Sequence, residues 1–100
     1  SSPEEASLGF DLEDITGKLV EGYKLAVEDG VVVTGVSTGS KAHRSGLREG
    51  DVILEVNRQR VESKSEVERE VARAQNRGKA IVMLVQRGTT TTFVSLSASR

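Results

Sequence analysis

The chain has 100 residues, of which 36% are hydrophobic and 29% charged, the balance of one globular domain with a single core. Its 14 basic and 15 acidic residues leave a net charge of -1, which argues against nucleic acid as a partner because phosphate-backbone binding needs a clustered basic excess. The lack of cysteine excludes disulfides and thiolate metal sites, and the lack of an apolar run of roughly 18 residues argues against membrane insertion.

The two ends of the chain differ in character from its middle. Residues 1–6 are polar and acidic, without the positive charge and apolar segment of a signal peptide. We therefore expect a linker or tail over 1–6, one domain over 7–97 and a second tail over 98–100, as in a domain that belongs to a longer protein.

The domain begins with apolar residues at alternate positions. Leu8, Phe10 and Leu12 follow the period of a strand, and Gly9 between them is a flexible joint. Residues 16–25 leave two interpretations open, since their apolar residues fit one helical turn while two glycines weaken a helix.

The middle of the chain alternates strands with a short helix. Residues 30–36 are rich in β-branched residues and predict a strand. A very short helix is expected over Lys41–Ser45, with Gly46 in the left-handed conformation that ends it. A second strand over 51–56 leads into a turn, and Val61 is expected to begin a brief further pairing.

The longest helix is expected to begin at Ser63. Ser63 and Glu66 have the spacing of a capping box, which satisfies two backbone N–H groups of the first turn. The helical pattern stops at 76–78, where an asparagine and a glycine end it. The apolar residues that recur at helical spacing are Val67, Val71 and Ala74.

Two further strands complete the expected fold. Residues 79–86 form a strongly apolar run, Arg87 and Gly88 are the expected hairpin turn, and residues 89–97 form the returning strand. We therefore predict an α+β, β-rich fold, a small, partly open antiparallel barrel or sandwich of five to six strands capped by two helices.

Residues that carry chemistry are sparse. The one histidine, His43, lies in a short polar segment and is interpreted as a solvated surface residue rather than as a catalytic base or metal ligand. The sequence has no phosphate-binding loop, and its acidic residues are mostly sequence neighbours whose side chains diverge. We therefore expect no catalytic residue, no metal and no cofactor in this chain.

The residues around Gly9 are a candidate anion site. A glycine between two large apolar residues lets successive backbone N–H groups point into one concavity. The terminal carboxylate of a peptide would accept hydrogen bonds from the amides of Leu8, Gly9 and Phe10, each contributing about 1.5–3 kcal/mol. The segment that follows would pair with the ligand as an added strand.

The expected long helix supplies the other wall of this groove. Val67 and Val71 lie one turn apart, and a ligand side chain buried between them would contribute roughly 1.5–3 kcal/mol. The same residues also fit the ordinary core face of a helix, an alternative that the periodicity leaves open. The predicted groove residues are Phe10, Asp11, Leu12, Val67, Val71 and Ala74.

The run 39–57 resembles the signature of PDZ domains. It contains a small-residue turn, a short helix, Gly46-Leu47, Gly50-Asp51 and an aliphatic strand in the order of that family. Ser7-Leu8-Gly9-Phe10 is similar to the family's carboxylate-binding Gly-Leu-Gly-Phe loop, with serine in place of the first glycine. The resemblance covers about residues 7–97 and implies a ligand groove between the first strand and the long helix.

The order of elements resembles the circularly permuted PDZ arrangement of bacterial proteins. Residues 30–33, 52–59 and 85–88 are similar to the PDZ domains of Do/HtrA-type periplasmic serine proteases, particularly the second, C-terminal one. The resemblance implies binding of exposed hydrophobic C-terminal or extended peptide segments, and contacts with the parent protease domain and neighbouring subunits. It also implies a periplasmic or otherwise extracytoplasmic location in a bacterium. Lys41 departs from the family, which usually has proline there.

Two functions therefore compete. The leading hypothesis is a non-catalytic module that captures such peptides, and so recruits substrate to a parent serine endopeptidase or regulates it. The alternative is an assembly domain that mediates contacts in the protease oligomer with little peptide binding, or an accessory PDZ domain of another membrane-associated protease or secretion component.

Overall fold

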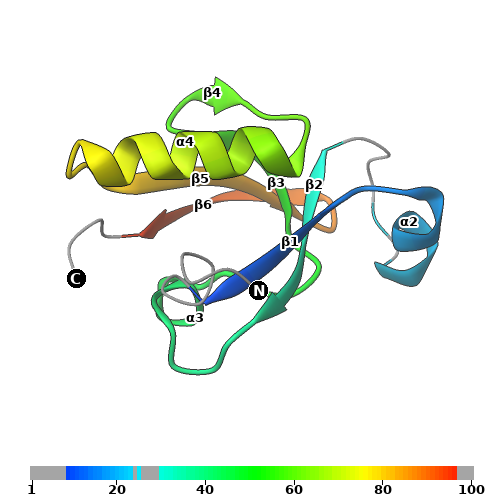
Figure 1. Ribbon diagram of the computed structural model, residues 1–100. Coiled ribbons are helices and arrows are strands. Elements are labelled where there is room, and N and C mark those ends of the chain that lie inside the picture. Colours follow the sequence, from blue (N-terminus) through cyan, green and yellow to red (C-terminus); the bar gives the residue numbers. More distant parts are fainter. Residues whose placement is uncertain (1–8, 24, 26–29, 97–100) are drawn as a thin grey trace.

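The computed structural model describes residues 9–23, 25 and 30–96 (Figure 1). Its centre is a six-stranded antiparallel sheet in the order β1-β2-β3-β5-β6, with the short β4 paired to β3. The strands are β1 (Phe10–Asp14), β2 (Val31–Val36), β3 (Val52–Val56), β4 (Gln59–Arg60), β5 (Ile81–Arg87) and β6 (Thr90–Leu96). The helices are α2 (Gly17–Tyr23), α3 (Lys41–Ser45) and α4 (Lys64–Asn76). This open sheet with its helices confirms the predicted α+β, β-rich fold.

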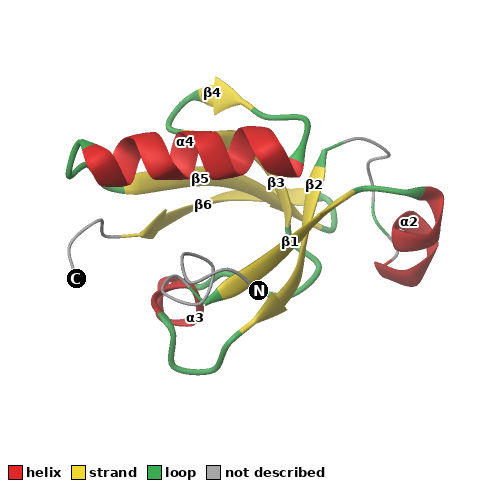
Figure 2. Cartoon of the chain, viewed as in Figure 1, coloured by secondary structure: helices red, strands yellow, loops and turns green. Residues whose placement is uncertain are grey.

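The core lies between α4 and the curved sheet. Helix α4 contacts β1, β3 and β5, while α3 contacts β6 (Figure 2). The core-facing residues of α4 recur at helical spacing, which places one apolar stripe against the strands. The buried core residues include Val31, Val33, Leu47, Ile53, Val56, Ile81, Met83, Val85 and Leu96.

Three side chains hold the start of α4. The Ser63 hydroxyl accepts a hydrogen bond from the Glu66 N–H at 3.3 Å, as the sequence predicts for an N-cap. The Glu66 carboxylate accepts from the N–H of Glu62 at 2.8 Å, one residue earlier than a capping box places it. From the end of β1, Asp14 Oδ1 accepts from the Lys64 N–H at 2.6 Å. The last of these bonds fixes the start of α4 to the far end of β1.

The brief pairing expected at Val61 occurs earlier in the chain. Asn57 and Arg58 both have positive φ, 50° and 70°, which is the backbone of a tight two-residue hairpin turn. The turn brings the next two residues back alongside β3, so the short strand β4 comprises Gln59–Arg60. Val61 follows it and donates from its N–H to the Leu54 carbonyl at 3.1 Å.

The structure also shows the position of the β5–β6 turn and the conformation of residues 16–25. Arg87 pairs with Thr90, so the β5–β6 turn consists of Gly88 and Thr89, one residue later than predicted. The ambiguous stretch 16–25 contains the helix α2, a third helix beyond the two expected, and none of its residues is buried. The predicted tails at 1–6 and 98–100 lie outside the described residues, as does the domain boundary at residue 7.

Candidate peptide-binding groove

Strand β1 lies at one edge of the sheet. Among the described residues, β2 is its one strand partner. The Gly9 carbonyl accepts a hydrogen bond from the Ser37 N–H of the β2 side at 2.7 Å. Because backbone groups of successive residues alternate in direction along a strand, the N–H and C=O of Phe10 point to the free edge. This edge offers unpaired backbone donors and acceptors to an incoming strand.

A bulge in the β1–β2 pairing leaves this free edge regular. Asp11 pairs with Gly35, but the next residue, Leu12, pairs with Val33. The extra residue, Thr34, therefore lies on β2 and not on β1. Leu12 consequently directs its backbone groups to the free edge just as Phe10 does, two residues apart.

Gly9 is held against the start of α3. Its φ of 87° is in the left-handed region that favours glycine, and a Cβ at this position would overlap the Ser40 side chain. The Ser40 hydroxyl donates to the Gly9 carbonyl at 3.4 Å and accepts from the His43 N–H at 3.2 Å as the N-cap of α3. Glycine is therefore the residue that fits here, and Gly9 and Phe10 lie at the head of the groove. The predicted amide donor Leu8 lies outside the described residues.

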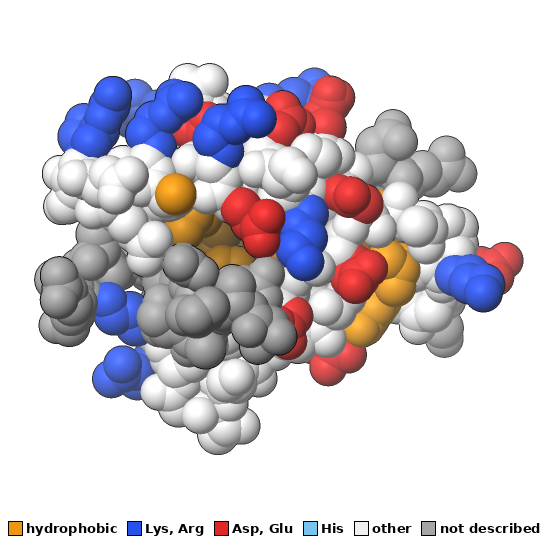
Figure 3. All heavy atoms as spheres, in the orientation of Figure 1, with side chains coloured by type: hydrophobic (Ala, Val, Ile, Leu, Met, Phe, Trp, Pro, Cys, Tyr) orange, Lys and Arg blue, Asp and Glu red, His pale blue; other side chains and the backbone are white. Residues whose placement is uncertain are grey.

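Hydrophobic side chains line the space between β1 and α4. Figure 3 shows a hollow with hydrophobic side chains between α4 and the start of β1. The predicted groove residues lie on these two elements, and those that face the core are nearly inaccessible, so they form a floor rather than an open wall. Their exposed fractions are 6% for Phe10, 6% for Leu12, 0% for Val67, 7% for Val71 and 3% for Ala74.

The remaining predicted groove residue, Asp11, occupies the other face of β1. It is exposed, and its Oδ2 lies 3.3 Å from the point where a Cβ of Gly35 would be. Because side chains alternate along a strand, Asp11 points away from the hydrophobic floor beneath Phe10 and Leu12. Asp11 therefore does not line the hydrophobic floor, unlike the other predicted groove residues.

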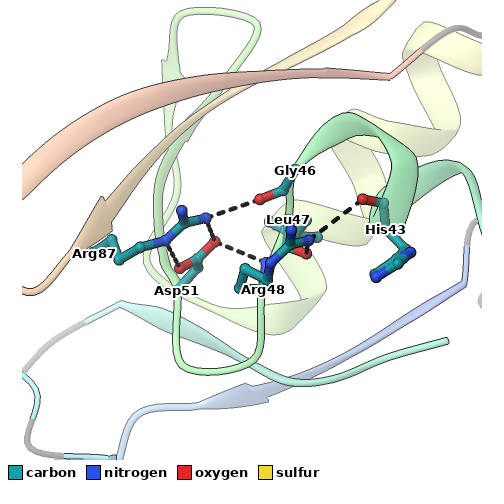
Figure 4. Close-up of polar contacts among 6 residues, drawn as sticks. All are labelled: His43, Gly46, Leu47, Arg48, Asp51 and Arg87. Carbon is teal, nitrogen blue, oxygen red and sulfur yellow. Dashed lines mark hydrogen bonds and ion pairs between the residues drawn. The ribbon is translucent and has the colours of Figure 1, made fainter. Parts of the chain in front are cut away.

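One buried carboxylate, Asp51, was not identified from the sequence as part of a hydrogen-bond network. Asp51 is 1% exposed and receives two parallel hydrogen bonds from Arg87, 2.8 Å from Nε and 2.7 Å from a terminal nitrogen (Figure 4). The Arg48 N–H donates to the same carboxylate at 3.0 Å, and Arg87 also donates to the Gly46 carbonyl at 2.8 Å. Hydrogen bonding to Asp51 raises the pKa of Arg87 above its ordinary value.

This network supports the groove from a distance. Arg87 ends β5, Asp51 precedes β3, and Gly46 caps the C-terminus of α3, so the bonds fix α3 to the sheet. The other end of α3 carries Ser40, which contacts Gly9. The sequence gives one local signal for each residue: Ser40 precedes a short helix as N-caps do, and Asp51 belongs to the Gly-Asp pair of the family signature.

Other site chemistry is limited. The His43 Nδ1 accepts from the Gly39 N–H at 3.2 Å, a local turn contact. In the ranges that the structure describes, no three His, Cys, Asp or Glu residues gather as metal ligands would. The helices within those ranges are also too short or too polar to span a membrane.

Comparison with known proteins identifies the family. The family model described as "PDZ domain" matches residues 32–87, more than half of the chain. The chain belongs to the PDZ domain family. It is 37% identical over 86 residues to a protein named "Probable periplasmic serine endoprotease DegP-like" from Brucella suis. The identity is 33% over 79 residues to "Serine endoprotease DegS" from Haemophilus influenzae. The chain covers 17% and 23% of the length of these relatives, so it corresponds to one part of each of them.

Solved structures agree with this assignment. An HtrA-type protease, AlgW, with a decapeptide superposes with a TM-score of 0.79 at 31% identity, covering 90% of this chain and 27% of that one. The HtrA3 PDZ domain bound to a phage-derived ligand, FGRWV, has a TM-score of 0.73 at 27% identity, covering 90% of this chain and 81% of that one. These findings confirm the resemblance to PDZ domains of HtrA-type proteases, in which the PDZ domain is a non-catalytic module.

Proposed function

We propose that this PDZ domain captures hydrophobic C-terminal or extended peptide segments by strand addition to β1. The observation that carries the proposal is the free edge of β1, where Phe10 and Leu12 direct backbone groups outward beside the hydrophobic floor under α4. At its head, Gly9 is fixed in a left-handed conformation, which favours N–H groups that converge on a carboxylate.

The floor residues define what the pocket accepts. Phe10, Val67 and Val71 present apolar surface without charge, so the last side chain of the ligand is aliphatic or aromatic. The phage-derived ligand of the HtrA3 PDZ domain, FGRWV, is a short peptide that ends in valine, which agrees with such a pocket. Weak capture, with a dissociation constant in the micromolar range, is the natural outcome of a short added strand and one buried side chain.

The parent of this domain is a serine protease, and the domain recruits substrate to it or regulates it. This part of the proposal rests on the relatives, whose names are those of serine endoproteases, and on the share of their length that the chain covers. The relatives called periplasmic favour an extracytoplasmic location. The domain itself performs no hydrolysis, and reproducible cleavage of casein by the isolated chain would contradict that.

A second candidate function, assembly of the protease oligomer, has one observation in its favour. On the far side of the sheet, Phe93 is 70% exposed and Val82 38% exposed. They border a shallow hollow of about 380 Å³ together with Leu84 and Arg58. Exposed aromatic and arginine side chains are enriched where proteins contact one another.

Titration followed by heteronuclear NMR separates the two functions. A five-residue peptide that ends in valine with a free carboxylate should shift the amide signals of residues 9–12 and 67–74. The same peptide with an amidated C-terminus is the control and should lose most of this effect, because the amide carries no charge for the N–H groups at Gly9. No shifts at millimolar peptide, or shifts centred on Val82 and Phe93, would reject the groove and favour the assembly function.

A further inference from the structure

The outer face of β1 is acidic where a ligand strand would lie. Its exposed residues on that face are Asp11 and Glu13, which alternate with the buried Phe10 and Leu12. The third acid of the strand, Asp14, is already engaged, because it accepts a hydrogen bond from the first N–H of α4. Two carboxylates therefore remain beside the free edge.

The fold does not neutralise these two carboxylates. In the described ranges, neither Asp11 nor Glu13 takes part in an ion pair or a side-chain hydrogen bond. The neighbour of Asp11 on β2 is Gly35, which has no side chain to cover the carboxylate. Figure 3 shows acidic side chains on this side of the molecule, next to the hollow.

The position of the carboxylate site fixes the direction of a ligand strand. A peptide whose C-terminus lies at Gly9 and which extends toward Asp14 runs antiparallel to β1. Its last residue then lies opposite Phe10 and faces the floor. The penultimate residue lies opposite Asp11, and the fourth from last lies opposite Glu13, both on the outer face.

The backbone geometry brings these side chains close together. Phe10 and Leu12 direct their backbone groups to the free edge, so they form the hydrogen-bonded pairs with a ligand strand. Asp11 and Glu13 then fall in the non-hydrogen-bonded pairs, where opposite Cα atoms are about 4.5 Å apart and side chains are closest.

We propose that the groove selects peptides with lysine or arginine at the penultimate and fourth-from-last positions. Asp11 selects the penultimate residue and Glu13 the fourth from last. The inference rests on the proposed peptide-binding function and adds to it the charge of the preferred ligand. Each exposed pair of opposite charges changes affinity about two- to fivefold, so the two together give about 4- to 25-fold.

Six-residue peptides test this preference on the whole chain. They have the sequence Ala-Ala-X-Ala-X-Val with a free carboxylate, where X is lysine, alanine or glutamate, placed at both X positions or at one with alanine at the other. Their affinities are measured by fluorescence anisotropy. The lysine peptide should bind tightest and the glutamate peptide weakest, and salt near 1 M should remove most of the difference because the pairs are exposed. A peptide with lysine only at the third position from the end should bind less tightly than the alanine peptide, since that residue faces the apolar floor.

Single variants assign each preference to one residue. Asp11→Asn should abolish discrimination at the penultimate position alone, and Glu13→Gln at the fourth from last alone. Glu21→Gln removes the same charge on α2, away from the groove, and should preserve both preferences. If peptides bind with equal affinity whatever their charge, this inference fails while the proposed function stands. If no peptide binds, both fail.

Discussion

Replacing Gly9 with alanine should weaken peptide binding more than it weakens the fold. Alanine at a φ of 87° costs about 1–2 kcal/mol, and its Cβ would overlap the Ser40 side chain, so the loop must move. The variant also loses the hydrogen bond from Ser40 to the Gly9 carbonyl. We therefore expect the loop geometry of the bound state to cost about 1.5–3 kcal/mol more in the variant than in wild type, which is roughly a 10- to 150-fold loss of affinity.

Two further variants isolate the cause. Gly88→Ala places alanine at a φ of 64° in the β5–β6 turn with no atom within 4 Å, so it is expected to add backbone strain alone and leave affinity unchanged. Adding Ser40→Gly to Gly9→Ala removes the overlap, and as an N-cap glycine costs only a few tenths of a kcal/mol relative to serine. The double variant should therefore bind more tightly than Gly9→Ala alone but less tightly than wild type, because the left-handed strain and the missing Ser40 hydrogen bond remain.

Anisotropy titration with a valine-ended peptide measures these affinities, and urea denaturation checks that each variant is folded. Wild-type affinity in Gly9→Ala would show that the loop does not need its left-handed glycine. Equal affinity of the single and double variants would refute the contact between residues 9 and 40 as the cause.

Two other predictions concern stability. Asp51→Asn keeps the shape of the side chain but removes the charge that Arg87 and a backbone N–H share, and should lower the free energy of unfolding by about 1.5–3 kcal/mol in urea denaturation. The loss should not exceed about 3 kcal/mol, because the Arg87 side chain is 49% exposed and regains solvation. Glu70→Gln, in a partly exposed pair whose arginine, Arg73, is 53% exposed, is the control and should cost less than about 1 kcal/mol; an equal loss in both would contradict the special role of Asp51. Tyr23→Phe removes a hydroxyl that donates to Glu49 at 2.7 Å, and this bond raises the pKa of Tyr23 above 10.0. A group whose pKa is raised in the folded state stabilises the fold below its ordinary pKa, here 10.0, and this stabilisation is lost as the pH rises through the raised pKa. At neutral pH the wild type should therefore have a higher melting temperature than the variant. In strongly alkaline buffer the two melting temperatures should converge. A melting difference that persists there would refute this assignment.

The elements with local signals could be predicted from the sequence. Ser63 precedes the apolar stripe of α4, Gly46 ends α3 with a φ of 101°, and the β-branched run over 30–36 forms β2. These features depend on residues within a few positions of one another, so the sequence pattern carries them directly. The prediction that a short strand begins at Val61 was wrong, because the chain already turns at Asn57 and Arg58. These two residues have positive φ, but no glycine marks the turn in the sequence.

The support of the groove could not be predicted in the same way. Ser40 lies 31 residues from Gly9, and Arg87 lies 36 residues from Asp51, so no periodicity connects them. Both contacts arise when the sheet brings distant segments together. The hydrophobic floor shows the same limit, because the spacing of Val71 on its helix fits a core face and a ligand pocket equally well.

The two carboxylates on the outer face of β1 also bear on how the protein behaves at high concentration. A free strand edge is a template on which copies of a chain can add to one another and aggregate. If two molecules paired β1 with β1, Asp11 and Glu13 of one would face the same acids of the other, and like charges directly opposite are destabilising. The edge thus repels its own copies and stays open to a strand of opposite charge.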